Sequence, residues 1–161
     1  MKRYSIWIAA AVLLVVGAMA VFMRVVGDDP AVWHVDPATA ERSGKPNDYM
    51  VAPDGAIAAQ ADQSTTVRDL PAKEHLFLFD AVAMNAPRTE IIGGSLDEGW
   101  ITYVQRSMLF GYPDYITVKA VEVEGGSALI VWSRARYGYG DMGVNRDRVE
   151  RWLAQIGEGQ S

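Results

Sequence analysis

The hydrophobic and polar positions along the 161-residue chain divide it into three parts. Residues 4–23 carry no charge at all. Residues 27–68 are rich in Pro, Ala, Asp and Gly and show neither a helical nor an alternating pattern. Residues 69–157 contain segments with helical or strand-like periodicity. We therefore predict an anchor at residues 1–26, an extended connecting arm at 27–68 and a folded domain at 69–157.

Within this domain, the pattern predicts a first and a last helix with strands between them. Pro71 suits the first turn of the first helix, because its missing N–H would be unpaired there in any case. This helix is expected to end near residues 85–87, and the last helix is expected at 143–156. Both have apolar residues at helical spacing: Leu76, Phe79, Val82 and Ala83 in the first, and Val149, Trp152, Leu153 and Ile156 in the last.

Four strand-like segments lie between the helices, at residues 89–92, 100–107, 115–124 and 127–133. The pair Gly125-Gly126 separates the last two and is typical of a two-residue hairpin turn, since glycine accepts a positive φ at both positions. The order helix, strands, helix predicts an α+β domain: an antiparallel sheet of about four strands packed by helices on one face. In the connecting arm, residues 56–58 and 65–67 are candidate short edge strands.

The uncharged stretch at residues 4–23 has the length of a helix that crosses a bilayer. Lys2 and Arg3 precede it, and the positive-inside bias places the N-terminus in the cytoplasm and the domain outside. The rival interpretation is a cleaved signal peptide with Ala18-Met19-Ala20 as its cleavage site. The bulky Val21-Phe22 pair after that site favours an uncleaved anchor. We predict a single-pass protein of the plasma (inner) membrane that contacts the lipid bilayer through residues 4–23 and carries its domain on the extracytoplasmic (periplasmic) side.

Composition narrows the classes of function. The chain after the anchor holds 12 basic and 20 acidic residues, a net charge of −8, which argues against a nucleic-acid binder. The chain has no cysteine, which excludes disulfides and thiolate metal sites. His34 and His75 are isolated from other metal-ligating residues, so we predict neither a metal nor a cofactor. His75 falls on the first helix and is expected at the surface or at the boundary of the core.

Five of the fifteen basic residues, all arginines, lie between Ser133 and Arg151 around a glycine-punctuated loop. Arginine pairs bidentately with carboxylate or phosphate and stays protonated near neutral pH. One interpretation is a clamp for an acidic ligand near the start of the last helix, where anions are favoured. The residues of this candidate ligand site are Arg134, Arg136, Asp141, Asn145 and Arg148. In the other interpretation, which we favour, Asp141 caps the helix and accepts a hydrogen bond from Arg136, so that the loop is locked.

The loop at residues 108–114 is unusually apolar for a turn. It is either a surface that touches a partner protein or lipid, or a connection that folds back onto the core. Two of its aromatic residues, Phe110 and Tyr112, join Tyr137 and Tyr139 as candidate partner contacts.

The segment at residues 136–149 resembles the signature of the domain of unknown function 1499 family. Members of that family end in an arginine-rich strand, a Gly-x-x-Asp-x-Gly-x-Asn-Arg-x-Arg turn and a closing helix, and residues 138–148 match this turn position by position. Weaker similarities upstream extend the resemblance to residues 45–156. The chain departs from the family at 132–136, where one arginine and one serine are lost, and in lacking cysteines. The resemblance implies a membrane-linked or exported α+β domain without an established activity.

The sequence lacks the motifs of several common enzyme classes. No Gly-x-Ser-x-Gly elbow or phosphate-binding Gly-x-x-x-x-Gly-Lys loop occurs. We therefore expect a non-catalytic module that binds a partner protein, such as a membrane protein, or an acidic ligand near the membrane. The alternative is a small enzyme that acts on an anionic envelope molecule through the arginines and Asp141. A pocket lined by those side chains would favour a ligand or enzyme site, and mutual pairing would favour a structural role.

Overall fold

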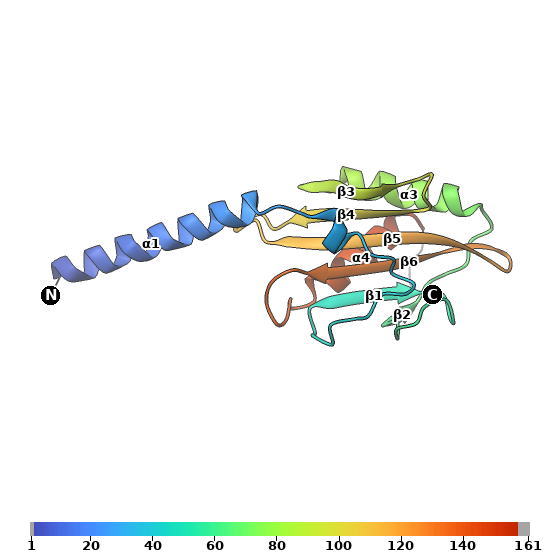
Figure 1. Cartoon of the computed structure of the whole chain (residues 1–161), viewed down its shortest axis with the longest axis horizontal. Coiled ribbons are helices and arrows are strands. Elements are labelled where there is room, and N and C mark those ends of the chain that lie inside the picture. Colours follow the sequence, from blue (N-terminus) through green and yellow to red (C-terminus); the bar gives the residue numbers. More distant parts are fainter. Residues whose placement is uncertain (1, 158–161) are drawn as a thin grey trace.

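The centre of the molecule is a six-stranded sheet in the order β2-β1-β6-β5-β4-β3 (Figure 1). The computed structural model describes residues 2–157, so Met1 of the expected anchor lies outside the described residues. Neighbouring strands are antiparallel except β1 and β2, which are parallel. The strands are β1 (Asp48–Ala52), β2 (Gln63–Ser64), β3 (Thr89–Ser95), β4 (Trp100–Arg106), β5 (Pro113–Val123) and β6 (Gly126–Ala135). The helices are α1 (Lys2–Val25), α2 (Pro30–Trp33), α3 (Ala72–Asn85) and α4 (Val144–Gln155).

Helix α1 projects away from the rest of the molecule (Figure 1). Its segment Tyr4–Val25 is the one described helix that is long and apolar enough to cross a membrane, and only 6% of its most apolar window is buried within the molecule. A signal sequence has the same length and composition. The structure thus supports an N-terminal apolar helix that is either an anchor or a signal.

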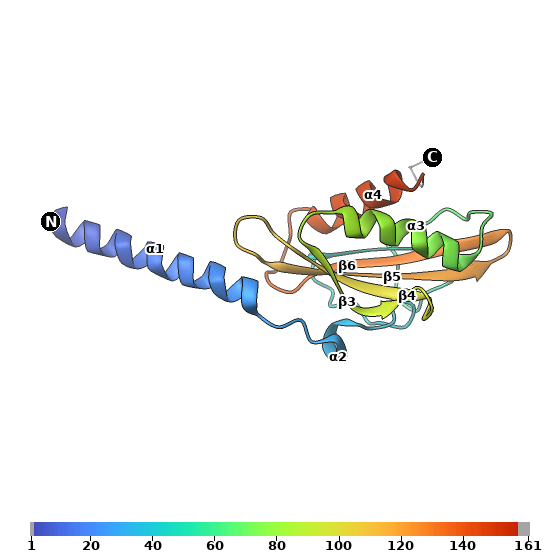
Figure 2. The same ribbon diagram turned by 90° about the horizontal axis from the view of Figure 1, so that it is seen from above.

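Helices α3 and α4 lie side by side on one face of the sheet (Figure 2), which confirms the α+β class and the expected helical covering. Phe79 of α3 meets Trp152 of α4 edge to face, with ring centroids 5.7 Å apart. The apolar face expected for α4 is buried throughout. In α3 the expected face is buried at Leu76, Phe79 and Ala83 and partly buried at Val82. Such edge-to-face packing of large rings is a strong source of core stability.

The expectation for His75 was wrong, because its side chain is fully buried against the sheet. Its Nδ1 lies 3.1 Å from the hydroxyl oxygen of Ser127 on β6. A buried imidazole needs such a hydrogen-bond partner, and this one comes from a residue far away in the sequence.

Strands β5 and β6 form the predicted antiparallel hairpin, with the turn one residue earlier than expected. Val123 pairs with Gly126, so Glu124 and Gly125 are the turn residues. Gly126 has a φ of 137°, and an added Cβ would collide with the carbonyl group of Arg68. This glycine is required because the connecting arm passes directly over the hairpin.

The sheet has six strands where about four were predicted, and the two additional strands come from the connecting arm. β1 pairs along β6, and Tyr49–Ala52 is buried. The candidate strands at 56–58 and 65–67 do not form, and β2 takes residues 63–64 instead. β1 is short and buried on both faces, so its sequence is a brief apolar run between Pro46 and Pro53 rather than an alternating pattern.

The opposite face of the sheet, which is free of long helices, is covered by the chain that follows α1. We name residues 28–36 the strap, and Figure 2 shows its short helix α2 on the side of the sheet away from α3 and α4. The two sides of the sheet are called the helix face and the strap face below.

Candidate functional site

The arginine-rich segment runs from the end of β6 through a glycine-rich loop into α4. Successive side chains of a strand point to opposite faces of the sheet, so Ser133 and Arg134 are separated by it. Ser133 contacts α4, whereas Arg134 contacts the strap. The structure therefore divides the candidate ligand residues into two groups: Asp141, Asn145 and Arg148 on the side of α4, and Arg134 and Arg136 on the side of the strap.

On the helix face, Arg148 is only 4% exposed and donates from all three guanidinium nitrogens. Its Nη2 forms an ion pair with Asp114 at 2.6 Å, and its Nε donates to Gln105 Oε1 at 2.7 Å. Its Nη1 donates to Ser133 Oγ at 2.9 Å and to Asn145 Oδ1 at 2.6 Å. This guanidinium joins α4 to three strands and is occupied by groups of the protein itself.

Asn145 also belongs to this network and is fully buried, as is Ser133. Its Nδ2 donates to the backbone oxygen of Asn47 at 3.1 Å and to Asp141 Oδ2 at 2.7 Å. Its Oδ1 also accepts from the Ser133 hydroxyl at 2.6 Å. The amide thus uses both its donor and its acceptor groups, and it fixes the start of α4 to the loop before β1.

Burial raises the pKa of Asp114 above the ordinary value of an aspartate, although the nearby Arg148 guanidinium favours the charged carboxylate. Asp141 adds a second negative charge in the vicinity and raises this pKa further. The largest cause is desolvation, so placing this ion pair in the interior is costly.

Asp141 satisfies the first turn of α4, as the capping interpretation predicted, although the N-cap residue itself is Gly143. Its carboxylate accepts from the backbone N–H of Gly143 at 3.0 Å and of Asn145 at 2.8 Å. The predicted hydrogen bond from Arg136 was wrong, because Arg136 Nη1 donates instead to the Gly27 carbonyl at 2.9 Å and to the Tyr115 hydroxyl at 3.1 Å. Arg136 lies two residues after Arg134 and shares its face of the sheet, which directs it away from Asp141.

On the strap face, Arg134 is 8% exposed and is held mainly by neutral groups. Its Nη2 donates to the backbone oxygen of Trp33 at 2.5 Å and its Nη1 to Thr117 Oγ1 at 3.3 Å. Its guanidinium carbon lies 3.9 Å from the ring centroid of Trp132, a cation–π contact. Burial lowers the pKa of Arg134 to about 10, against the opposing influence of Asp48. The guanidinium is still charged at neutral pH.

Two ion pairs fasten the strap to the sheet. Asp28 accepts from Arg106 Nη2 at 2.6 Å, and its other oxygen accepts from the Tyr115 hydroxyl at 2.7 Å. Asp36 accepts from Lys119 Nζ at 2.5 Å. Burial and the hydrogen bond to Asp28 raise the pKa of Tyr115 to about 12, so this phenol remains a hydrogen-bond donor at neutral pH.

Stacked rings complete the covering of this face. Trp33 lies parallel to Tyr115 with centroids 3.9 Å apart, and His34 lies parallel to Trp100 at 3.7 Å. His34 Nδ1 is 2.9 Å from Thr102 Oγ1. Burial lowers the pKa of His34, although the negative charge of Glu98 acts in the opposite direction. The strap is therefore a packed layer of the fold.

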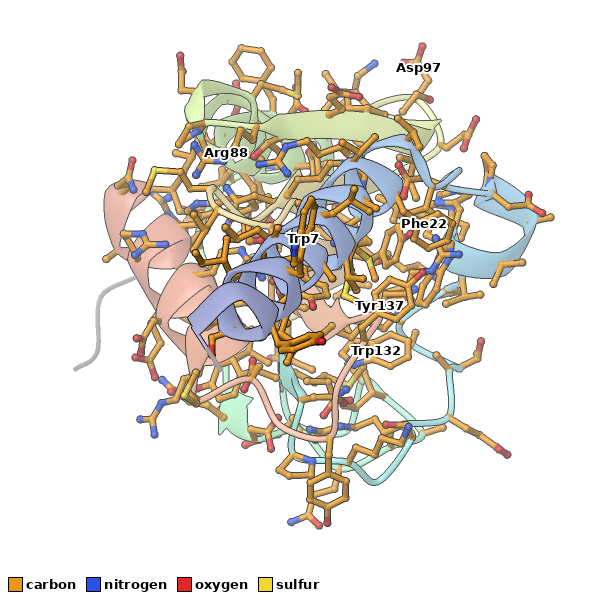
Figure 3. All side chains as sticks on the ribbon, turned by 90° about the vertical axis from the view of Figure 1, so that its left-hand side faces the viewer. Trp7, Phe22, Arg88, Asp97, Trp132 and Tyr137 are labelled. Carbon is orange, nitrogen blue, oxygen red and sulfur yellow. The ribbon has the colours of Figure 1, made fainter. Side chains whose placement is uncertain are left out.

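The aromatic residues predicted as partner contacts lie in the loop between β4 and β5 and in the loop after β6. We name the loops at residues 107–112 and 136–143 the anchor-side edge, which Figure 3 views with α1 pointing toward the reader. The rings of Phe110 and Tyr112 are 6.0 Å apart, and those of Tyr112 and Tyr137 are 6.2 Å apart. Tyr139 is 75% exposed and stands apart from this row. The structure brings three of the four residues together.

Two open cavities border the anchor-side end of the domain. One, of about 470 Å³, lies between the end of α1 and β4; the other, of about 390 Å³, lies between α3 and α4. None of the predicted ligand residues lines either cavity. Within residues 2–157, no group of histidines and acidic residues has the arrangement of a metal site. Ligand binding by the arginine-rich segment stays a prediction without a test.

Sequence reasoning missed the groups that hold these arginines in place. Asp114 and Gln105 complete the surroundings of Arg148, and Trp33 and Asp28 build the strap face. The sequence did contain a sign that Arg148 is buried on the helix face. Asn145, Arg148 and Val149 share the spacing of the apolar face of α4, which places both polar residues on the buried side. The strap carries no comparable signal, because its short helix α2 buries no residue fully.

Comparison with known proteins gives one finding that agrees with this architecture. No match was found among the curated proteins or the solved structures. The family described as "Protein of unknown function (DUF1499)" matches residues 30–156, which run from the strap to the end of α4. The match includes β1 and begins earlier than the predicted similarity at residue 45. Since the matched region covers most of the chain and contains both faces of the sheet, this protein belongs to the DUF1499 family.

Proposed function

We propose that this protein is a single-pass membrane protein whose domain binds a partner protein at the extracytoplasmic surface of the plasma (inner) membrane. Lys2 and Arg3 before the apolar helix favour a cytoplasmic N-terminus. A domain that contains no cysteine is compatible with the oxidising compartment on the other side.

The observation that carries the proposal is the apolar surface of the anchor-side edge. Met108 is 75% exposed, Leu109 is 69% exposed and Met142 is fully exposed at 100%. Exposed methionine and aromatic side chains are characteristic of contact surfaces. Arg24 at the end of α1 donates to the backbone oxygens of Met108 and Leu109, at 3.1 and 2.8 Å. This surface is thereby held next to the apolar helix, where a membrane protein would be met.

The arrangement of the arginines supports binding over catalysis. Arg148 is occupied by four side chains of the protein, and Arg134 is covered by the strap. A substrate would have to displace these contacts before it reached either guanidinium. The exposed edge requires no such rearrangement.

The partner is tested by site-specific photocrosslinking of the full chain in intact cells. A photoreactive residue in place of Tyr139 is expected to give a discrete adduct with a membrane protein. The same residue in place of Phe77, a 53% exposed position on α3, is the matched control and is expected to give no such adduct. Identical adducts at both positions, or none at Tyr139, would contradict the proposal.

The topology is tested separately. A reporter fused after Ser161 is expected to be active only outside the cytoplasm, and a cytoplasm-only reporter that was active there would refute the placement. Sequencing of the mature N-terminus is expected to give the uncleaved chain. A mature chain beginning at Val21 would establish the cleaved signal instead.

A further inference from the structure

The cavity of about 470 Å³ at the end of α1 has a composition that the proposed protein contact leaves unexplained. It lies where α1, the start of the arm, β3 and the end of β4 meet. It combines three arginines, two acidic residues and apolar groups. Its lining residues are Arg24, Val26, Asp28, Arg88, Glu90, Val104, Arg106, Ser107, Met108 and Gly111.

The arginines of this lining outnumber its carboxylates, and they differ in whether they form an ion pair. Arg106 forms the ion pair with Asp28 at 2.6 Å. Within residues 2–157, the hydrogen-bond acceptors of Arg24 are neutral backbone oxygens, those of Ala20, Met108 and Leu109. With Asp28 occupied, two arginines, Arg24 and Arg88, face one remaining carboxylate. The lining therefore retains an excess of positive charge at the end of the apolar helix.

Arg88 is the more available of these two arginines. Its Nε donates to the backbone oxygen of Arg106 at 2.9 Å, and among the described residues no hydrogen bond or ion pair involves its Nη1 or Nη2. Its backbone has a φ of 58°, an uncommon conformation for a residue other than glycine. Glu90, the remaining carboxylate of the lining, is exposed and forms no ion pair with another described residue. Arg88 thus presents two NH2 groups without a described partner, in an orientation fixed by its Nε.

The position of the cavity corresponds to one layer of a membrane. Arg24 is the first charged residue after the uncharged span at 4–23, and such a residue lies at the depth of the lipid headgroups when the helix crosses a bilayer. Met108 and Leu109, next to Arg24, are 75% and 69% exposed. Exposed apolar side chains at this depth enter the boundary between headgroups and acyl chains.

We infer that this cavity binds the phosphate group of a phospholipid, with the acyl chains along the apolar surface of α1. A guanidinium offers paired donors that match two phosphate oxygens, and Arg24 and Arg88 supply the charge. The inference rests on the anchored placement in the proposed function but not on the identity of any protein partner. Met108 and Leu109 then face the lipid, and the partner protein is met by the rest of the anchor-side edge, where Met142 is fully exposed.

The experiment counts the phospholipids retained by the full chain. The protein is extracted from nanodiscs of phosphatidylcholine alone, or of phosphatidylcholine and phosphatidylglycerol in equal parts, and analysed by native mass spectrometry. Arg88→Gln is expected to lower lipid retention about fivefold, the effect of about one arginine charge at a membrane surface. Arg88→Lys keeps the charge and is expected to retain lipid better than Arg88→Gln.

The matched control is Arg146→Gln, because Arg146 is an exposed arginine of α4 that lines neither cavity and pairs with Glu150. This variant is expected to retain lipid as the wild type does. Equal retention by the Arg88→Gln and Arg146→Gln variants would overturn the inference. Binding of inorganic phosphate without retained lipid would also overturn it, by assigning the cavity to a free anion.

Failure of the lipid experiment is distinguishable from failure of the proposed function. The Tyr139 crosslink and the topology reporter do not depend on Arg88. A crosslinked partner with Arg88-independent lipid retention would remove only the lipid site. Arg88-dependent retention without a crosslink would remove only the protein partner.

Discussion

The two faces of the sheet each bury an arginine, and they satisfy its guanidinium in different ways. Arg148 on the helix face has a carboxylate partner, Asp114, and donates from every nitrogen to a side-chain oxygen. Arg134 on the strap face is held by a backbone oxygen, a threonine hydroxyl and an indole ring. The first arginine is matched in charge by regular structure that surrounds it, and the second depends on a short stretch of chain laid over it.

This difference indicates which face can open. The partners of Arg148 belong to α4, β4, β5 and β6, so exposing it requires the core to separate. The covering of Arg134 belongs to the strap, whose α2 is only four residues long. A segment with few regular hydrogen bonds opens at lower free energy than a packed core. We therefore expect substitutions on the helix face to affect global stability and those in the strap to act locally.

The largest effect is expected for Asp114→Ala, which leaves the Arg148 guanidinium buried without its carboxylate. Breaking one partner of a buried pair typically costs about 3–5 kcal/mol. Arg148→Met is expected to cost less, because the Asp114 carboxyl can take up a proton, whereas an arginine cannot lose one. Thermal and urea unfolding of the full chain in detergent measure both variants. A smaller loss for Asp114→Ala than for Arg148→Met would contradict the charge-matched account of this face.

The next effect is expected for Trp33→Ala in the strap. This change removes the ring stacked on Tyr115, whereas the backbone oxygen of residue 33 that accepts from Arg134 is still present. We expect the free energy of opening the strap to fall by about 2–3 kcal/mol from the lost ring contacts and apolar burial. Hydrogen exchange is expected to accelerate at residues 28–36 while the amides of α4 keep their protection. Equal acceleration in both segments would show that the strap and the helix face open as one unit.

A smaller effect is expected for Asp141→Ala, which removes the cap of α4 at a cost of about 0.5–2 kcal/mol. Asp141→Asn keeps a capping oxygen and is expected to cost less. Because Arg136 lies on the other face, Arg136→Ala is expected to add to Asp141→Ala within about 0.5 kcal/mol. The double variant in the same unfolding experiments checks this, and a coupling larger than that would mean that the two residues communicate across the sheet.

The smallest expected effect is a dependence of folding stability on pH that arises from His34 in the strap. Its pKa is lowered in the folded state, so the unfolded state, with a pKa near 6.5, takes up the proton first. Stability is expected to fall as pH drops below 6.5 and to level off below the pKa of the folded state. The charged group near the imidazole is Glu98, whose attraction for the imidazolium reduces this effect.

The control for this dependence is the difference between the wild type and His34→Gln. Asp114 has a raised pKa and contributes with the opposite sign, because the folded state gains stability as that carboxyl is protonated. Its contribution is common to both proteins and cancels in the difference. A wild-type curve parallel to that of His34→Gln between pH 6.5 and acid pH would refute the role of His34 in the strap.

The spacing of apolar residues predicted those helices and strands that are long enough for the spacing to recur within them. The apolar face of α4 and the β5–β6 hairpin follow from spacing and from a glycine pair, and both are present. The strand β1 could not be recognised in this way, because a five-residue strand buried on both faces does not alternate. Its position depends on β6, which lies more than 70 residues further along the chain.

The candidate site was predicted in part. The cap by Asp141 is local and follows from the turn chemistry, and it is present. The Arg136–Asp141 pair failed because nearness in sequence does not determine the face of a sheet, whereas strand alternation from Ser133 does. The contacts of Trp33 with Arg134 and Tyr115 join residues that are far apart in the sequence, and no local pattern encodes them.

The short connection between α1 and the strap determines how far the domain reaches. Only residues 26–29 separate α1 from α2, a length of at most about 14 Å when fully extended. Arg106 and Arg136 hold two backbone oxygens of this connection, those of Val26 and Gly27, at 3.0 and 2.9 Å. If α1 spans a bilayer, this connection is too short for the domain to move far from the membrane surface. The anchored placement that we propose would therefore keep the domain at the membrane surface, and a partner would have to be bound there.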